Sequence, residues 1–345
     1  MTLSSKFQWQ ADACERLGSP MYAHLLSQVA QDVDRGGVSA GVLAGHEDDP
    51  GPSGLALRLA GSVHRMVLEG RAPALAAYYP SVGGSWDEAA GWAAFEALLK
   101  EQPDVVREWL DRPPQTNEVG RAGALMGGLL HLERPDLPVR LFEIGSSGGL
   151  NLRVDHFGYT DERGGHYHGR ASLVLERAWV GRELDLARRV RVAERVGSDV
   201  MPVDVGTSLG RLTLTSYVWP DQAARLERLR GAFEVAARVP AEVRRQDAAA
   251  FVDALEPTDG ATTVLWHSVM WQYLSSVEQE ALAARVEALG ERATGNRRFA
   301  HLFLEPWRRT PDSPHEFLVV LREWPGGERR ILGASVGHGI PTTWE

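Results

Sequence analysis

Residues 139–151, VRLFEIGSSGGLN, constrain the fold of this chain more than any other stretch. An apolar run that contains one acid, Glu143, is followed at once by a glycine-rich segment, which predicts a buried strand, a tight turn and then a helix. Glycine suits such a turn because a side chain would keep the backbone away from a ligand, and because the turn requires positive φ. The amides of the next helix would face that ligand, so the pattern is typical of a nucleotide site.

Two well-known glycine loops do not fit this stretch. The dinucleotide fingerprint G-x-G-x-x-G is absent because Ser146 and Ser147 separate Gly145 from Gly148, and no phosphate loop ending in Gly-Lys-Ser/Thr occurs. The remaining pattern, E-x-G-x-x-G-G, resembles the first motif of the class I S-adenosylmethionine-dependent methyltransferases. More narrowly, the whole chain resembles a bacterial family of uncharacterised methyltransferase-like proteins, a domain of unknown function. The alternative is a tight turn in some other α/β protein.

The resemblance implies a Rossmann-like α/β fold, S-adenosylmethionine as the cofactor, and a glycine turn against the methionine and ribose part of it. Residues 212–219 are interpreted as a second strand, and Asp221 at its end resembles the acid that holds the ribose hydroxyls; a helix cap is the alternative. In the third resemblance, Asp247 of an Asp-Ala pair would contact the adenine amine. The expected cofactor-binding residues are Glu143, Gly145, Ser146, Ser147, Gly148, Gly149, Asn151, Asp221, Gln222, Asp247, Ala248, His267 and Ser268.

Polar and aromatic residues follow the predicted strand 262–266. Ligands of open parallel sheets lie beyond the carboxyl ends of the strands, so His267 is predicted to be the general base of a methyl transfer. A buried core histidine packed by tryptophans is the alternative. A polar cluster at the helix start before the central strand, and a tyrosine in the loop 77–84, are also candidates to line the site, with capping and packing as the alternatives. The expected substrate-binding residues are Asn117, Glu118, Arg121, Tyr79, Trp271, Gln272 and Tyr273.

The order of the patterns predicts two parts. Residues 1–136 have apolar residues at helical spacing and are expected to form a helical N-terminal lobe. Residues 137–345 are expected to form the Rossmann-like methyltransferase domain, with a β-rich insertion at about 159–211 that lies over or beside the site as hairpins. The chain would close with an antiparallel C-terminal hairpin over 317–336, and by the resemblance the last strand inserts antiparallel to the others.

Composition limits the function classes. The formal net charge of -9 argues against a general nucleic-acid binder, and no run of 18 apolar residues that would span a membrane occurs. The single cysteine, Cys14, excludes an intramolecular disulfide and cysteine-based zinc sites, and no metal is expected. With these classes excluded, the resemblance to methyltransferases makes a cytoplasmic protein that methylates an unidentified small molecule the leading hypothesis. A non-catalytic S-adenosylmethionine-binding or regulatory protein and a nicotinamide-dependent oxidoreductase are the alternatives, and no oligomeric state is predicted.

Overall fold

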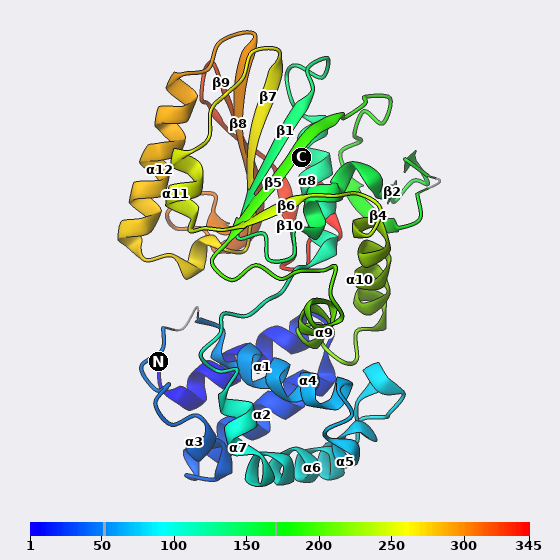
Figure 1. Ribbon diagram of the computed structural model, residues 1–345, viewed down its shortest axis with the longest axis vertical. Helices are drawn as coiled ribbons and strands as arrows, with labels where there is room; N and C mark the ends of the chain where they lie inside the picture. The colour runs from blue at the N-terminus through cyan, green and yellow to red at the C-terminus, as the bar shows by residue number, and fades with distance from the viewer. Residues whose placement is uncertain (51–52, 170) are drawn as a thin grey trace. The chain divides into compact units, whose positions relative to one another are not determined.

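The computed structural model describes residues 1–50, 53–169 and 171–345, which divide into two compact units (Figure 1). One unit contains Met1–Thr116 and Thr207–Glu227, and the other contains Asn117–Gly206 and Arg228–Glu345. The predicted lobe boundary near residue 136 thus lies within the second unit. Residues 51–52 of the predicted lobe and residue 170 of the predicted insertion lie outside the described residues.

The first unit is built from helices around a fully buried apolar core that includes Phe7, Leu25, Leu59 and Phe95. Most of its longer helices are capped at the N-terminus by a side chain. Asp87, for example, accepts a hydrogen bond from the amide of Ala90 at the start of α6. The helical elements are α1 (Leu3–Arg16), α2 (Pro20–Asp34), α3 (Val38–Val42), α4 (Leu55–Leu68), α5 (Pro73–Ala76), η2 (Pro80–Val82), α6 (Glu88–Glu101), α7 (Pro103–Arg107), α9 (Ser208–Ser216) and the start of α10 (Ala223–Ala236).

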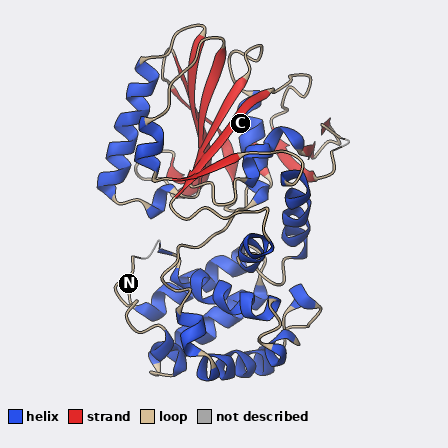
Figure 2. Cartoon of the chain, viewed as in Figure 1, coloured by secondary structure: helices blue, strands red, loops and turns tan. Residues whose placement is uncertain are grey.

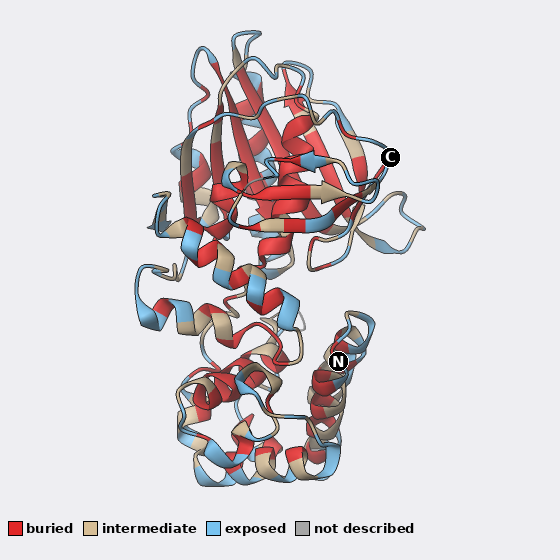
Figure 3. Cartoon of the chain, turned by 90° about the vertical axis from the view of Figure 1, so that its right-hand side faces the viewer, coloured by how far each residue is buried: buried red, intermediate tan, exposed pale blue. Residues whose placement is uncertain are grey.

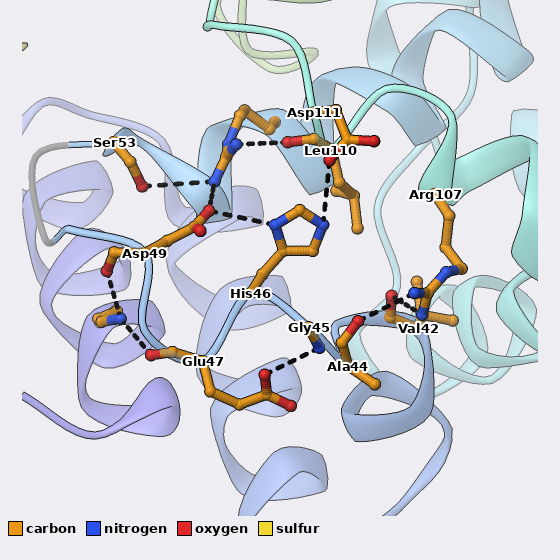
Figure 4. Close-up of polar contacts among 12 residues, drawn as sticks. Val42, Ala44, Gly45, His46, Glu47, Asp49, Ser53, Arg107, Leu110 and Asp111 are labelled. Carbon is orange, nitrogen blue, oxygen red and sulfur yellow. Dashed lines mark hydrogen bonds and ion pairs between the residues drawn. The ribbon is translucent and has the colours of Figure 1, made fainter.

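Three basic residues, Arg58, His46 and Arg107, contact the segment that follows α3 (Figure 4). The guanidinium of Arg58 donates to the Asp49 carboxylate and to the carbonyl of Leu110, and the same carboxylate contacts Nδ1 of His46 at 3.2 Å. Arg107 donates at 2.9 Å to the carbonyl of Val42. These hydrogen bonds satisfy backbone carbonyls at the ends of helices and in the turn near Leu110. A structural role therefore accounts for the cluster.

The predicted second strand over 212–219 is wrong, because these residues continue helix α9 and the turn after it. Thr207 caps this helix by accepting from the amide of Gly210, and Leu214 is buried, so capping and packing override the alternating pattern. Asp221 follows no strand. Its two carboxylate oxygens accept from the Ser19 hydroxyl at 2.6 Å and from the Met21 amide at 3.1 Å, which stabilises the first turn of α2.

The second unit contains a single sheet with the strand order β3-β2-β4-β11-β10-β9-β8-β7-β1-β5-β6 (Figure 2). The strands β8, β7, β1, β5 and β6 are mutually parallel. Strand β9 is antiparallel to β8, and β10 is antiparallel to β9. A mixed α/β fold with a large, mostly parallel sheet is therefore confirmed. The strands are β1 (Val139–Ile144), β2 (Gly158–Asp161), β3 (His166–Tyr167), β4 (Val174–Gly181), β5 (Val192–Asp199), β6 (Glu242–Arg245), β7 (Ala261–Ser268), β8 (Arg297–Arg308), β9 (His315–Trp324), β10 (Arg329–Ser335) and β11 (Thr342–Trp344).

Helices cover both faces of this sheet, whose strands are largely buried (Figure 3). On one face, α11 and α12 pack on Phe142, Ile144 and Leu265. On the other face, α8 approaches closely because it carries glycines: a Cβ at Gly128 would lie 2.6 Å from the Leu302 side chain. The helical elements of this unit are η3 (Val119–Arg121), α8 (Ala122–Leu130), η4 (Leu150–His156), the end of α10, α11 (Ala248–Asp253), η5 (Trp271–Tyr273) and α12 (Ser276–Glu291).

Two details of the predicted sheet are wrong. The stretch 159–211 is not one insertion, because β5 within it pairs with β1 in the centre of the parallel sheet, while β2, β3 and β4 extend the far edge of the same sheet. The C-terminal strands also differ from the expected order. β9 pairs directly with β8, and β10 with β9, so no later strand inserts next to β8; the last strand, β11, joins β10 to β4.

Candidate functional site

The glycine turn after β1 has the backbone that the sequence predicts. Gly145 and Gly149 have φ values of 67° and 65°, and Ser147 between them has a φ of 53°. The amide of Ser146 donates to the carbonyl of Ser198 at 3.0 Å, which anchors the turn on the end of β5. A Cβ at Gly145 would lie 2.9 Å from the Cβ of Met270. Glycine is needed at 145 both for its φ and for this close approach.

An acid that the sequence analysis missed lies at the end of β5. Asp199 accepts hydrogen bonds from the amides of Ser147 at 2.9 Å and Met201 at 2.8 Å. Because β5 is parallel to β1 and pairs with it, Asp199 lies beside the glycine turn at the carboxyl edge of the sheet. The sequence signal for Asp199 is the tripeptide Gly-Ser-Asp at the end of the short β-like run that follows Arg191. This signal is far from the glycine turn along the chain, because strands β2, β3 and β4 come between them.

Asp247 follows the next strand, β6, as predicted, and it is the N-cap of α11, where its carboxylate accepts from the amide of Ala250 at 2.8 Å. Ala248 is the first residue of that helix. Since β6 is parallel to β5 and pairs with it, the Asp-Ala pair lies at the same edge as Asp199. The carboxyl ends of β1, β5 and β6 therefore carry the glycine turn and two acids together.

The segment before α8 connects the glycine turn to the end of β7. Asn117 accepts through Oδ1 from the amide of Leu150 at 3.0 Å, and Asn151 donates through Nδ2 to the carbonyl of Glu118 at 3.2 Å. Arg121 donates through Nη1 to the carbonyl of Ser268 at 3.3 Å. Five residues that the sequence analysis selected thus lie together, and the hydrogen bonds named here are with the protein itself.

Glu143 is the buried acid of this region, with an exposed fraction of 3%. Successive strand residues face opposite sides, so Glu143 faces the α8 side of the sheet, while Phe142 and Ile144 face α11 and α12. Burial raises the pKa of its carboxyl group to about 8, and the nearby Trp266 indole, followed by the cations of Arg121 and Arg153, opposes this rise only in part. Its Oε2 atom has no hydrogen-bond partner among the described residues.

His267 belongs to a buried hydrogen-bonded chain on the opposite side of the sheet. It lies within β7, so its side chain shares a face with Leu265, toward α12. Its Nδ1 atom lies 2.8 Å from Oε1 of Glu305, and its Nε2 atom lies 3.0 Å from Nε2 of His301. The Glu305 oxygen also accepts from the amides of Met270 at 3.0 Å and Trp271 at 3.2 Å. His301 and Glu305 were not identified from the sequence.

A small cavity of about 60 Å³ adjoins this chain. Trp271, whose ring stacks on His267 with centroids 5.1 Å apart, forms part of its wall. The complete lining is His267, Trp271, Ala283, Val286, His301, Phe303, Trp307, Arg322 and Arg329. Of the other predicted substrate residues, Gln272 and Tyr273 lie in η5, and Tyr273 is 45% exposed.

Three of the predicted site residues belong to the helical unit. Tyr79 is fully buried and packs against the ring of His64 with centroids 5.6 Å apart. Gln222 donates through Nε2 to the carbonyl of Leu17 at 2.7 Å, and the Asp221 carboxylate holds the start of α2. Each of the three side chains is therefore engaged within its own unit.

Fold and site together define an α/β protein whose parallel strands present a glycine turn and acids at one edge. The chain belongs to the family DUF2332, described as an uncharacterised protein conserved in bacteria, whose model matches residues 4–344. No curated protein and no solved structure matched the chain. Among the helices of the described residues, none combines the length and the apolar character that crossing a membrane requires. The same residues contain no cluster of three or more His, Cys, Asp or Glu suited to a metal ion.

Proposed function

We propose that this protein binds S-adenosylmethionine at the carboxyl edge of its parallel strands and transfers the methyl group to a small molecule. The observation that carries the proposal is the glycine turn after β1 with Asp199 and Asp247 at the ends of the two strands beside it. The chain runs from β1 to β5 and β6 on one side and then to β7 on the other, and ligands of open α/β sheets bind where the strand order reverses in this way.

The residues at this edge suit the chemical groups of the cofactor. A carboxylate has about four acceptor sites, so Asp199 and Asp247 retain capacity for ribose hydroxyls and for the adenine amine beside the amides that they already bind. A cationic group beside Glu143 would favour release of its proton, because the buried carboxyl group has a raised pKa of about 8 and an ionised carboxylate without a partner is costly there. When bound, S-adenosylmethionine would supply a methyl group activated by a sulfonium.

The protein's own part in such a reaction is alignment and the removal of a proton from the acceptor. His267 remains the predicted base, but both of its ring nitrogens are engaged, with Glu305 and His301. A proton from a ligand would therefore reach His267 through His301, and His267 would act by positioning that second ring. This enclosure of His267 is also the observation that favours the alternative, a protein that binds S-adenosylmethionine without catalysis. Incubation of cell extract with radiolabelled methyl donor and the protein distinguishes the two, since only the enzyme labels an acceptor.

A matched pair of substitutions tests the cofactor site. We expect Asp199→Asn to weaken binding of S-adenosylhomocysteine about ten- to a hundredfold, because the variant loses a charged hydrogen-bond acceptor while its amide oxygen still accepts from one of the two backbone amides. Asp221→Asn makes the same chemical change at a carboxylate that holds the start of α2, and it should leave the affinity unchanged. Isothermal titration calorimetry measures both.

Melting curves without ligand show first that both variants fold. Equal affinity of Asp199→Asn and the wild-type protein would remove Asp199 from the site. Loss of binding in Asp221→Asn alone would return the ribose contact to the residue that the sequence selected. No binding of S-adenosylhomocysteine or S-adenosylmethionine to the wild-type protein would refute the proposed function itself.

A further inference from the structure

The cavity beside His267 combines aromatic walls with an excess of positive charge. Trp271, Phe303 and Trp307 are its aromatic lining residues, and Arg322 and Arg329 are its charged ones. No carboxylate belongs to the lining. A small, partly open space with cations and no acid in its lining favours an anionic ligand over a neutral or cationic one.

The two arginines differ in what already binds them. Arg322 donates to the Glu287 carboxylate, with Nη2 at 3.2 Å from Oε2, and through Nε to the carbonyl of Gly327 at 3.1 Å. The guanidinium of Arg329 lies 5.2 Å from the centroid of the Trp307 ring, and within the described part of the chain it makes no hydrogen bond or ion pair. Arg329 is therefore the cation at this cavity that retains its full capacity to bind an anion.

The hydrogen-bonded chain determines which atom His301 presents. In the tautomer of His267 that donates through Nδ1–H to Glu305, at 2.8 Å, Nε2 of His267 is the acceptor for Nε2–H of His301 at 3.0 Å. His301 stays neutral because burial, and then the neighbouring His267, Arg322 and Arg329, lower its pKa well below the ordinary value. Its Nδ1 atom is then a hydrogen-bond acceptor, and it has no partner among the residues that the structure describes.

We propose that this cavity binds a small carboxylate that also carries a hydroxyl group, with the carboxylate on Arg329 and the hydroxyl donating to Nδ1 of His301. A volume of about 60 Å³ is enough for several water molecules or for one group of this size. Glu305 and His267 fix the tautomer of His301, and thus the preference for a ligand that donates. The site lies on the α12 side of the sheet and requires neither the glycine turn nor a bound cofactor.

Three related small molecules test the two contacts separately. Glycolate has both the charge and the hydroxyl, acetate lacks the hydroxyl, and glycolamide lacks the charge. We expect glycolate to bind the wild-type protein about three- to tenfold more tightly than acetate, as one neutral hydrogen bond allows, and glycolamide not to bind. Titrations followed by calorimetry at constant ionic strength, without S-adenosylmethionine or its product, keep this test independent of the proposed function.

Two variants and one control complete the test. Arg329→Gln should weaken glycolate about ten- to a hundredfold, because it removes a charged hydrogen-bond donor. Arg330→Gln is the control, because the Arg330 side chain pairs with Glu323 and is not part of the lining. His301→Phe should remove the preference for glycolate over acetate.

The proposal fails if glycolate does not bind the wild-type protein, or if Arg329→Gln binds it as well as Arg330→Gln does. Equal binding of glycolate and glycolamide would overturn the role of the charge. A preference for glycolate that persists in His301→Phe would overturn the role of Nδ1. If His301→Phe does not fold, the comparison of Arg329→Gln with Arg330→Gln still decides the anion site.

Discussion

Replacing Glu143 by glutamine is expected to raise the free energy of unfolding at about pH 9 by roughly 3–5 kcal/mol relative to the wild-type protein, and to change it far less at about pH 5. Burial raises the pKa of this carboxyl group from 4.5 to about 8 in the folded protein. The folded state therefore holds the proton more tightly than the unfolded state. The resulting stability is fully present below pH 4.5 and is lost as the pH rises toward 8, whereas glutamine has no proton to lose.

Urea denaturation of both proteins at the two pH values measures this difference. The exposed Glu328 provides the control, since Glu328→Gln should show no comparable dependence on pH. A difference between wild type and Glu143→Gln that is the same at both pH values would mean that Glu143 titrates normally. A loss of stability in Glu143→Gln at high pH would contradict the sign of the predicted effect.

The second large effect is expected at Glu305, where alanine should lower the free energy of unfolding by about 3–5 kcal/mol. One oxygen of this carboxylate accepts from His267 and from the amides of Met270 and Trp271, and the residue is 1% exposed. Removing the carboxylate leaves one buried donor, on His267, and two partly buried amides, of Met270 and Trp271, without a partner. Each unsatisfied group costs about 1–3 kcal/mol, so the sum is large even after partial relaxation.

Glu305→Gln is the matched comparison, because its amide oxygen still accepts from the backbone amides. The decrease in the free energy of unfolding should therefore be clearly smaller for Glu305→Gln than for Glu305→Ala. Glu316→Ala removes a partly exposed carboxylate that pairs with Arg309, the residue after the end of β8, and it should cost about 0–1 kcal/mol. Urea denaturation midpoints with unchanged slopes report these differences. A loss in Glu305→Ala no greater than that in Glu316→Ala would show that the three donors find other partners.

Local patterns in the sequence were sufficient where one segment fixes its own structure. The apolar run of β1 followed by glycines predicted a strand and a turn with positive φ, and both are present. The antiparallel hairpin predicted over 317–336 is likewise present, as strands β9 and β10. In each of these cases, periodicity, caps or turn residues lie within a few residues of one another.

Strand β5 shows why the position of the second acid was not predicted. Half of its sequence, VAERVGSD, is polar, and only its pairing with β1 makes it a central strand that ends in Asp199. The segment LTLTSYVW, residues 212–219, was in contrast predicted to be a strand although it forms none. Its alternation favours a strand, but the Thr207 cap and burial of Leu214 against other helices make it helical, and Asp221 then caps α2 instead of ending a strand.

The sequence by itself determined the glycine turn and the mostly parallel α/β character, and it indicated His267 as a candidate site residue. Each of these inferences depends on residues that are neighbours along the chain. Only the tertiary structure decided what surrounds His267. The parallel register that pairs His267 with Phe303 brings His301 and Glu305, two residues to either side on β8, onto the same face. That register depends on the packing of the whole sheet, so the buried chain of Glu305, His267 and His301 leaves no local signal in the sequence.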